Sequence, residues 1–184
     1  MSYAHRSDAF ADGKVPDAYA VISSLLDGIV ARLIPPFTLS KLEGDAVFAY
    51  ATDPSALPKG PKVFECIDAC YADFRGRVDT AHSVWQCWCE ACSRIDQLDL
   101  KFVLHAGPFV IQSIAGGAEL VGPEVVIAHR LLKSRAAELL GNNAFAFVTD
   151  AASELLDIPA DGGVAIVETY EPSPPVSGHA FALT

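Results

Sequence analysis

The chain has 184 residues and a formal net charge of −10, and 51% of its residues are hydrophobic. A chain of this length suits one domain and buries roughly two-thirds of its unfolded surface, so its core needs neither a metal nor disulfides. The acidic charge disfavours general nucleic-acid binding, because it repels phosphate backbones. We find no apolar run typical of a membrane span or a signal peptide. We therefore expect one cytoplasmic domain over residues 1–184 that binds neither nucleic acid nor membrane.

The first half of the chain predicts helices on either side of a β-hairpin. After a polar and irregular start over residues 1–16, apolar residues recur at alternating spacings of three and four, which is the pattern of one helix face. Two short apolar runs then flank Glu43-Gly44-Asp45, a tight turn. The expected elements are a helix over residues 17–33, two strands within 37–50, a loop over 52–62, a helix over 63–78 and a helical segment with an irregular end over 81–95.

The second half predicts most of the strands. Residues 98–105 alternate between apolar and polar side chains, which is typical of a strand with one buried face. Pro123 and Glu124 suit the first turn of a helix, and Gly141 suits the position just past its end. The expected elements are strands over 98–105, 109–114, 144–149 and 164–170, a turn at 115–118, a helix over 123–140, a short helix over 151–156, and a Pro-rich tail over 171–184 that is a loop or an edge strand.

The order of these elements indicates an α+β domain with a mixed β-sheet and helices packed on its faces. Within it, two segments resemble class III adenylyl and guanylyl cyclases. Residues 41–50 (KLEGDAVFAY) are similar to a strand–turn–strand in which a Gly-Asp turn carries a metal-binding aspartate. Residues 101–132 are similar to a later block, in which a strand ends in His-x-Gly, a hairpin follows, and a helix carries Ala-x-Arg. Together with a Cys-x-Cys-x-x-Cys segment, they resemble an uncharacterised bacterial domain family related to these nucleotidyl cyclases.

The resemblance implies a ferredoxin-like core and a homodimer, because the active sites of these cyclases form between subunits. It also implies Mg²⁺ or Mn²⁺ ions, which activate the attacking hydroxyl and neutralise the leaving pyrophosphate. Asp45 matches one metal-binding aspartate, although an aspartate in a turn also serves by accepting backbone N–H bonds. We expect the family's first strand, which carries the second metal-binding aspartate, to be missing or altered here. We expect the N-terminal residues to be irregular or to be contributed across a dimer.

Arg130 matches the arginine with which the family holds the transition-state phosphate. Val126, however, stands where the family has an asparagine that holds the ribose. Valine forms no side-chain hydrogen bond, and loss of one positioned donor costs roughly a hundred- to a thousandfold in rate. Arg130 is expected on one helix face with Val126, His129 and Lys133, either as an anion site or as a solvated stripe paired with surface acids.

Lys41 and Glu119 match the two positions that select the base in this family. Lysine is the choice typical of adenine, whereas glutamate is neither the usual aspartate nor the cysteine of guanylyl enzymes. Two alternatives remain open at this stage: the two residues bind a nucleotide, or they form a salt bridge that plugs the pocket. Glu43, two residues before Asp45, is placed to share a cation with it.

All five cysteines crowd into one third of the chain. Cys87, Cys89 and Cys92 have the spacing of metal ligands, and Cys70 or His82 would complete the four that a structural zinc requires. The alternative is a set of reduced, partly buried thiols. His105, which ends a strand before a glycine, is expected to be a structural histidine with its hydrogen bonds satisfied.

We therefore expect a catalytically degenerate, cyclase-like domain that is regulatory or binds a small ligand, such as an adenine nucleotide with Mg²⁺ or Mn²⁺. One alternative is an active or weakly active class III cyclase, a phosphorus–oxygen lyase, whose native N-terminus lies upstream of Met1. Another is a protein-interaction module in which the cysteine segment binds zinc.

Overall fold

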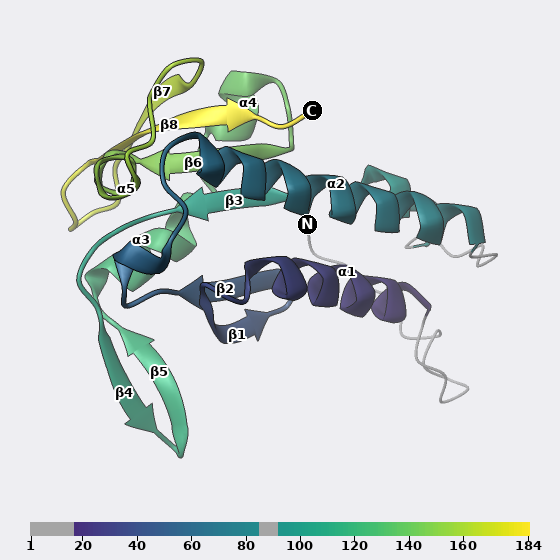
Figure 1. Cartoon of the computed structure of the whole chain (residues 1–184), viewed down its shortest axis with the longest axis horizontal. Coiled ribbons are helices and arrows are strands. Elements are labelled where there is room, and N and C mark those ends of the chain that lie inside the picture. The colour runs from purple at the N-terminus through teal and green to yellow at the C-terminus, as the bar shows by residue number, and fades with distance from the viewer. Residues whose placement is uncertain (1–16, 85–91) are drawn as a thin grey trace.

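The computed structural model describes residues 17–84 and 92–184, arranged as Figure 1 shows. Its elements are α1 (Asp17–Leu33), β1 (Thr38–Glu43), β2 (Ala46–Tyr50), the 3-10 helix η2 (Pro54–Ala56), α2 (Pro61–Val84), the 3-10 helix η3 (Cys92–Gln97), β3 (Lys101–Leu104), β4 (Val110–Ile114), β5 (Gly117–Val121), α3 (Pro123–Leu131), α4 (Ala136–Leu140), β6 (Phe145–Thr149), α5 (Asp150–Leu156), β7 (Val164–Glu168) and β8 (Val176–Ala182). Their strands form the hairpin β1-β2, the sheet β3-β6-β8-β7 and the hairpin β4-β5.

The larger sheet is mixed, which confirms the prediction of an α+β domain with a mixed sheet. β3 lies parallel to β6, whereas β8 lies antiparallel to both β6 and β7. β6 is the middle of the domain because its two faces belong to two different cores. Phe145 and Phe147 pack in the core that contains α3 and α4, while Ala146 and Val148 pack in the core that contains α1 and α2. Successive side chains of a strand point to opposite faces, so β6 is buried throughout.

Helices α1 and α2 lie side by side, with α2 in front of the larger sheet and α1 next to the hairpin β1-β2 (Figure 1). Val21, Leu25 and Ile29, each four residues apart on α1, are buried in the core that α2 shares. At the polar side of the contact, Arg77 Nε donates to Asp73 Oδ2 of the same helix α2 at 2.7 Å, and Arg32 Nη2 of α1 lies 3.4 Å from Asp73 Oδ1. Gly28 of α1 makes room for Arg77, since a Cβ at position 28 would lie 2.5 Å from Arg77 Nε.

The single helix expected over residues 123–140 is wrong, because α3 ends at Leu131 and α4 begins at Ala136. The break is held by tertiary structure: the backbone N–H of Arg135, just before α4, donates to Glu168 Oε1 of β7 at 2.9 Å. The helix expected over 63–78 is also longer than predicted, running from Pro61 to Val84, and the strand expected over 98–105 is shortened to Lys101–Leu104.

The tail over residues 171–184 is neither a loop nor an edge, contrary to the prediction. Its residues Val176–Ala182 form β8, which lies between β6 and β7. The close approach to β6 depends on Gly178, since a Cβ there would overlap the carbonyl oxygen of Val148 and lie 2.8 Å from Thr149 Cα. The tail is therefore a central part of the sheet.

The predictions for residues 1–16 fall outside the described part of the chain, as do Cys87 and Cys89. Within residues 17–84 and 92–184, none of the helices has the length and apolar character needed to cross a membrane.

Candidate functional site

The hairpin β1-β2 presents a set of functional side chains on one face. Its two-residue turn, Gly44-Asp45, places Glu43 opposite Ala46, and Lys41 lies opposite Phe48. Paired residues share a face, and so do residues two apart, so Lys41, Glu43 and Phe48 point to the same side. The pairing register shifts between Leu39 and Lys41, and such a bulge changes the direction in which the following side chain points.

Lys41 lies between two carboxylates, one from Glu43 on the same strand and one from Glu119, 78 positions along the chain. Its Nζ lies 3.0 Å from Glu43 Oε1 and 3.3 Å from Glu119 Oε2 of β5. The hydrogen bond to Glu43, and after it the bond to Glu119, raises the pKa of Lys41 above its usual value. The salt bridge between Lys41 and Glu119, one of the two alternatives left open by the sequence, is therefore present.

The salt bridge between Lys41 and Glu119 leaves both side chains accessible to solvent. The side chains of Lys41 and Glu119 are 37% and 41% exposed. Ion pairs this exposed contribute little to folding stability, since water solvates the separated charges almost as well. A ligand that offers its own donor and acceptor can therefore replace the mutual contact at small cost.

His129 of α3 extends the same cluster. Its Nδ1 lies 3.2 Å from Glu43 Oε2, and its ring stacks on Phe48 with ring centroids 4.4 Å apart. The sequence placed His129 in a cationic stripe and did not anticipate this contact with Glu43. The sequence did contain one indication that Glu43 belongs with Lys41. The two residues are two positions apart, which places both side chains on one face of β1.

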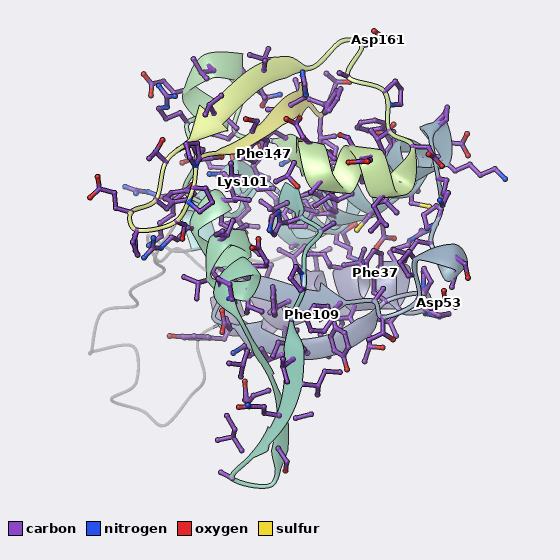
Figure 2. The ribbon with its side chains drawn as sticks, turned by 90° about the vertical axis from the view of Figure 1, so that its left-hand side faces the viewer. Phe37, Asp53, Lys101, Phe109, Phe147 and Asp161 are labelled. Atoms are coloured by element: carbon purple, nitrogen blue, oxygen red, sulfur yellow. The ribbon has the colours of Figure 1, made fainter. Side chains whose placement is uncertain are left out.

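The β4-β5 hairpin contacts the hairpin β1-β2 at two places. Glu119 lies on β5 and contacts Lys41, while Phe109, just before β4, packs edge-on against Tyr50 with ring centroids 5.7 Å apart. Figure 2 shows Phe109 where the hairpin joins the body of the domain. The candidate site, which we call the Lys41 cluster and define as Lys41, Glu43, Phe48, Glu119 and His129, thus lies where β1-β2, β4-β5 and α3 meet.

Arg130 points to different neighbours. Its guanidinium lies over the ring of Tyr170 at 5.7 Å, and its Nη1 lies 3.5 Å from the carbonyl oxygen of Glu171. Lys133 lies beyond the end of α3, so the continuous stripe expected from the helical spacing does not form. Val126, in contrast, is 50% exposed on α3, and an apolar side chain there offers no hydrogen bond to a ligand.

Asp45 lies in the β1-β2 turn and is exposed. Its neighbour Gly44 has φ +63°, a conformation that glycine adopts without strain. The structure places Asp45 in this turn, and the backbone hydrogen bonds expected of its side chain stay a prediction. Within residues 17–84 and 92–184, no group of three or more His, Cys, Asp or Glu side chains is arranged to hold a metal ion.

Cys70 lies inside the core between α1 and α2, where its side chain is only 1% exposed. Burial raises the pKa of its thiol to about 11, which disfavours the thiolate that binds a metal. Cys66, one turn earlier on α2, is exposed. The proposed ligands Cys87 and Cys89 lie outside the described residues, as does the side chain of Cys92.

His105 is the structural histidine that the sequence predicted. Its side chain is 8% exposed, its Nε2 lies 2.7 Å from Glu124 Oε2, and its Nδ1 lies 3.1 Å from Thr149 Oγ1. Glu124 belongs to the first turn of α3, and Thr149 caps α5. The histidine therefore ties the end of β3 to the starts of two helices.

Comparison with known proteins places these residues in a family. A family of proteins of unknown function (DUF2652) matches residues 22–139 of the chain. An uncharacterized protein of Mycobacterium tuberculosis is 31% identical over 123 residues, which cover 65% of this chain and 53% of that protein. The chain thus spans about half the length of this curated relative. All five residues of the Lys41 cluster lie within the matched range.

Proposed function

The chain belongs to the family of proteins of unknown function DUF2652, and we propose that it is a non-catalytic domain that binds an adenine nucleotide at the Lys41 cluster. The observation that carries the proposal is the contact of Lys41 with Glu119, residues 78 positions apart, at a surface open to solvent. The proposal also uses the resemblance of both positions to the base-selecting residues of class III cyclases.

The chemistry of the pair suits the hydrogen-bonding edge of adenine. Lys41 is a donor, and it would donate to the ring nitrogen N1. Glu119 is an acceptor, and it would accept from the N6 amino group. The stacked rings of His129 and Phe48 lie next to Glu43, and flat apolar surfaces of this kind favour contact with a base.

A regulatory role fits these residues better than cyclisation does. Val126 has no group with which to hold a ribose, and Arg130 is engaged by Tyr170 and the Glu171 backbone. A domain that binds the base but positions the phosphates poorly gains affinity without transition-state stabilisation, so it reports the presence of a nucleotide without consuming it.

The test is a titration of the full chain with AMP, ADP and ATP, with and without Mg²⁺ or Mn²⁺, beside an assay for cyclic nucleotide. We expect saturable binding and no cyclic product. Lys41→Met should weaken binding about tenfold or more, because it removes a charge-assisted donor. The matched control is Lys59→Met, which removes another exposed lysine whose Nζ lies 3.4 Å from Asp157 Oδ2.

Equal loss of affinity in both lysine variants would contradict the assignment of the site, and so would unchanged affinity in Lys41→Met. Formation of a cyclic nucleotide would favour an active cyclase instead. Absence of binding under every metal condition would reject the proposal.

A further inference from the structure

The β4-β5 hairpin projects from the body of the domain as an arm (Figures 1 and 2). Both of its faces carry exposed apolar side chains. Paired residues share a face, so Val110, Val121 and Ile114 lie on one side, and Ile111 lies on the other. Their exposed fractions are 57%, 40%, 50% and 45%. Glu119 pairs with Gln112 and therefore shares the face of Val110, and it contacts Lys41, so the face that carries Ile111 is turned away from the Lys41 cluster.

The turn of the arm determines which backbone groups are free. Ala115 and Gly116 form a two-residue turn with φ +51° and +84°, the sign pattern of a type I′ hairpin. In such a hairpin the closing pair, here Ile114 and Gly117, exchanges both hydrogen bonds, and bonded pairs then alternate with non-bonded pairs. The N–H and C=O groups of Ile111 and Ser113 therefore point away from β5, along the outer edge of β4.

This outer edge has none of the features with which proteins usually protect an exposed strand. β4 has no charged residue, no proline and no bulge, and residues 106–118 contain no charged side chain. Unprotected apolar edges pair readily with another strand. The edge of β5, in contrast, carries Glu119, whose side chain contacts Lys41.

The absence of charge also indicates what pairs with this edge. In a chain of net charge −10, two copies repel each other except where they meet through uncharged surfaces. The outer edge of β4 is such a surface, and it offers no charge with which to attract or orient a basic partner. A two-fold axis also makes two copies of the same strand antiparallel, so one apolar edge is complementary to itself.

We propose that the outer edge of β4 pairs with β4 of a second copy of this chain, antiparallel and centred on Gln112. Ile111 then exchanges hydrogen bonds with Ser113 of the second copy, and Ser113 does so with Ile111 of the second copy. The two hairpins become one four-stranded sheet, and the exposed residues Val110 and Ile114 of both copies line one continuous face.

The experiment measures the mass of the full chain by light scattering and sedimentation over a wide concentration series. Ser113→Pro removes an outward N–H donor and leaves the bonded pairs of the hairpin intact. The matched control is Ala118→Pro, because Ala118 is the cross-strand partner of Ser113 and faces the opposite edge of the arm. We expect a dimer for the wild type and for Ala118→Pro. We expect dimerisation about tenfold or more weaker for Ser113→Pro, since the two-fold axis uses each lost bond twice.

A second pair of variants covers the case in which proline disturbs the hairpin. Ile111→Lys places a charge next to the centre of the contact and should give a monomer, whereas Val167→Lys, at a comparably exposed strand position of β7 (52% against 45%), should leave the dimer intact. Circular dichroism verifies the fold of each variant. A wild type that stays monomeric up to its solubility limit overturns the proposal. So does a dimer that survives both Ser113→Pro and Ile111→Lys. None of these variants changes the Lys41 cluster, so this outcome is separate from that of the nucleotide titration.

Discussion

Replacement of Gly178 by alanine is expected to destabilise the domain, because β8 approaches β6 too closely to admit a side chain at this position. The added Cβ would overlap the carbonyl oxygen of Val148 and lie 2.8 Å from Thr149 Cα. Both contacts are with backbone of a strand that is buried on both faces, so neither neighbour can rotate away as a flexible side chain would.

Overpacking of this kind costs about 1–3 kcal/mol. For a domain of this length the corresponding fall in Tm is roughly 2–12 °C. The matched control is Gly76→Ala, since Gly76 lies inside α2 and a Cβ there meets no atom within 4 Å. Alanine is a better helix former than glycine, so Gly76→Ala should stabilise the domain by about 0.5–1 kcal/mol.

The assay is urea unfolding followed by circular dichroism, with the slopes of the three proteins compared to verify that the extent of unfolding is unchanged. The reasoning is refuted if Gly178→Ala is as stable as the wild type. That result would mean that β8 does not lie between β6 and β7 at the distance described, and that the tail is peripheral as its sequence suggests.

Three further predictions concern the thiols, the helix contact and the arm. In the folded protein, Cys66 should react with iodoacetamide near pH 8 while Cys70 stays unmodified in peptide mass spectra, because burial raises the Cys70 pKa to about 11; equal labelling would contradict this. The hydrogen bond from Arg77 lowers the pKa of Asp73. The ionised Asp73 carboxylate therefore stabilises the fold above about pH 4, and this stabilisation is lost as the pH falls and the carboxylate is protonated. Asp73→Asn should therefore lower stability at pH 7 by up to about 1 kcal/mol, and the difference from wild type should shrink in acid; a constant difference would argue against it. Because Glu119 lies on the arm, saturating adenine nucleotide should change the dimerisation constant measured by sedimentation, and an unchanged constant would show that the two sites are independent.

Local patterns in the sequence located most elements, because their burial follows simple spacings. The spacing of apolar residues gave α1 with its bounds, and the turn at Glu43-Gly44-Asp45 gave the hairpin β1-β2. The break between α3 and α4 had no such local signal. It depends on Glu168, more than thirty residues later, whose carboxylate accepts from the backbone of Arg135.

β8 was missed for a related reason. Its buried positions are filled by Gly178 and Ala180, which are too small to produce an apolar pattern. The volume at this place in the core comes from Phe145 and Phe147 of the neighbouring strand β6. A strand with small buried residues, packed next to a strand with large ones, cannot be recognised from its own side chains.

The candidate site was predictable in part. Lys41 and Glu119 were expected near each other from a resemblance, and the structure brings them into contact. The role of His129 was not predictable, because it depends on how α3 packs over the face of β1-β2 that carries Glu43 and Phe48. Arg130 was expected from the resemblance to hold a phosphate, and the structure places its guanidinium against Tyr170 and the carbonyl oxygen of Glu171, in the connection between β7 and β8.

The proposed recognition of adenine by Lys41 and Glu119 is tested most directly by comparing the affinities of ATP and ITP for the full chain. Inosine carries an oxygen in place of the N6 amino group and a proton on N1, so it exchanges the donor and acceptor that the pair would contact. We predict that ITP binds about tenfold or more weakly than ATP and that Glu119→Gln, whose amide can donate as well as accept, reduces the difference. Equal affinity for the two nucleotides in the wild-type chain would contradict the account.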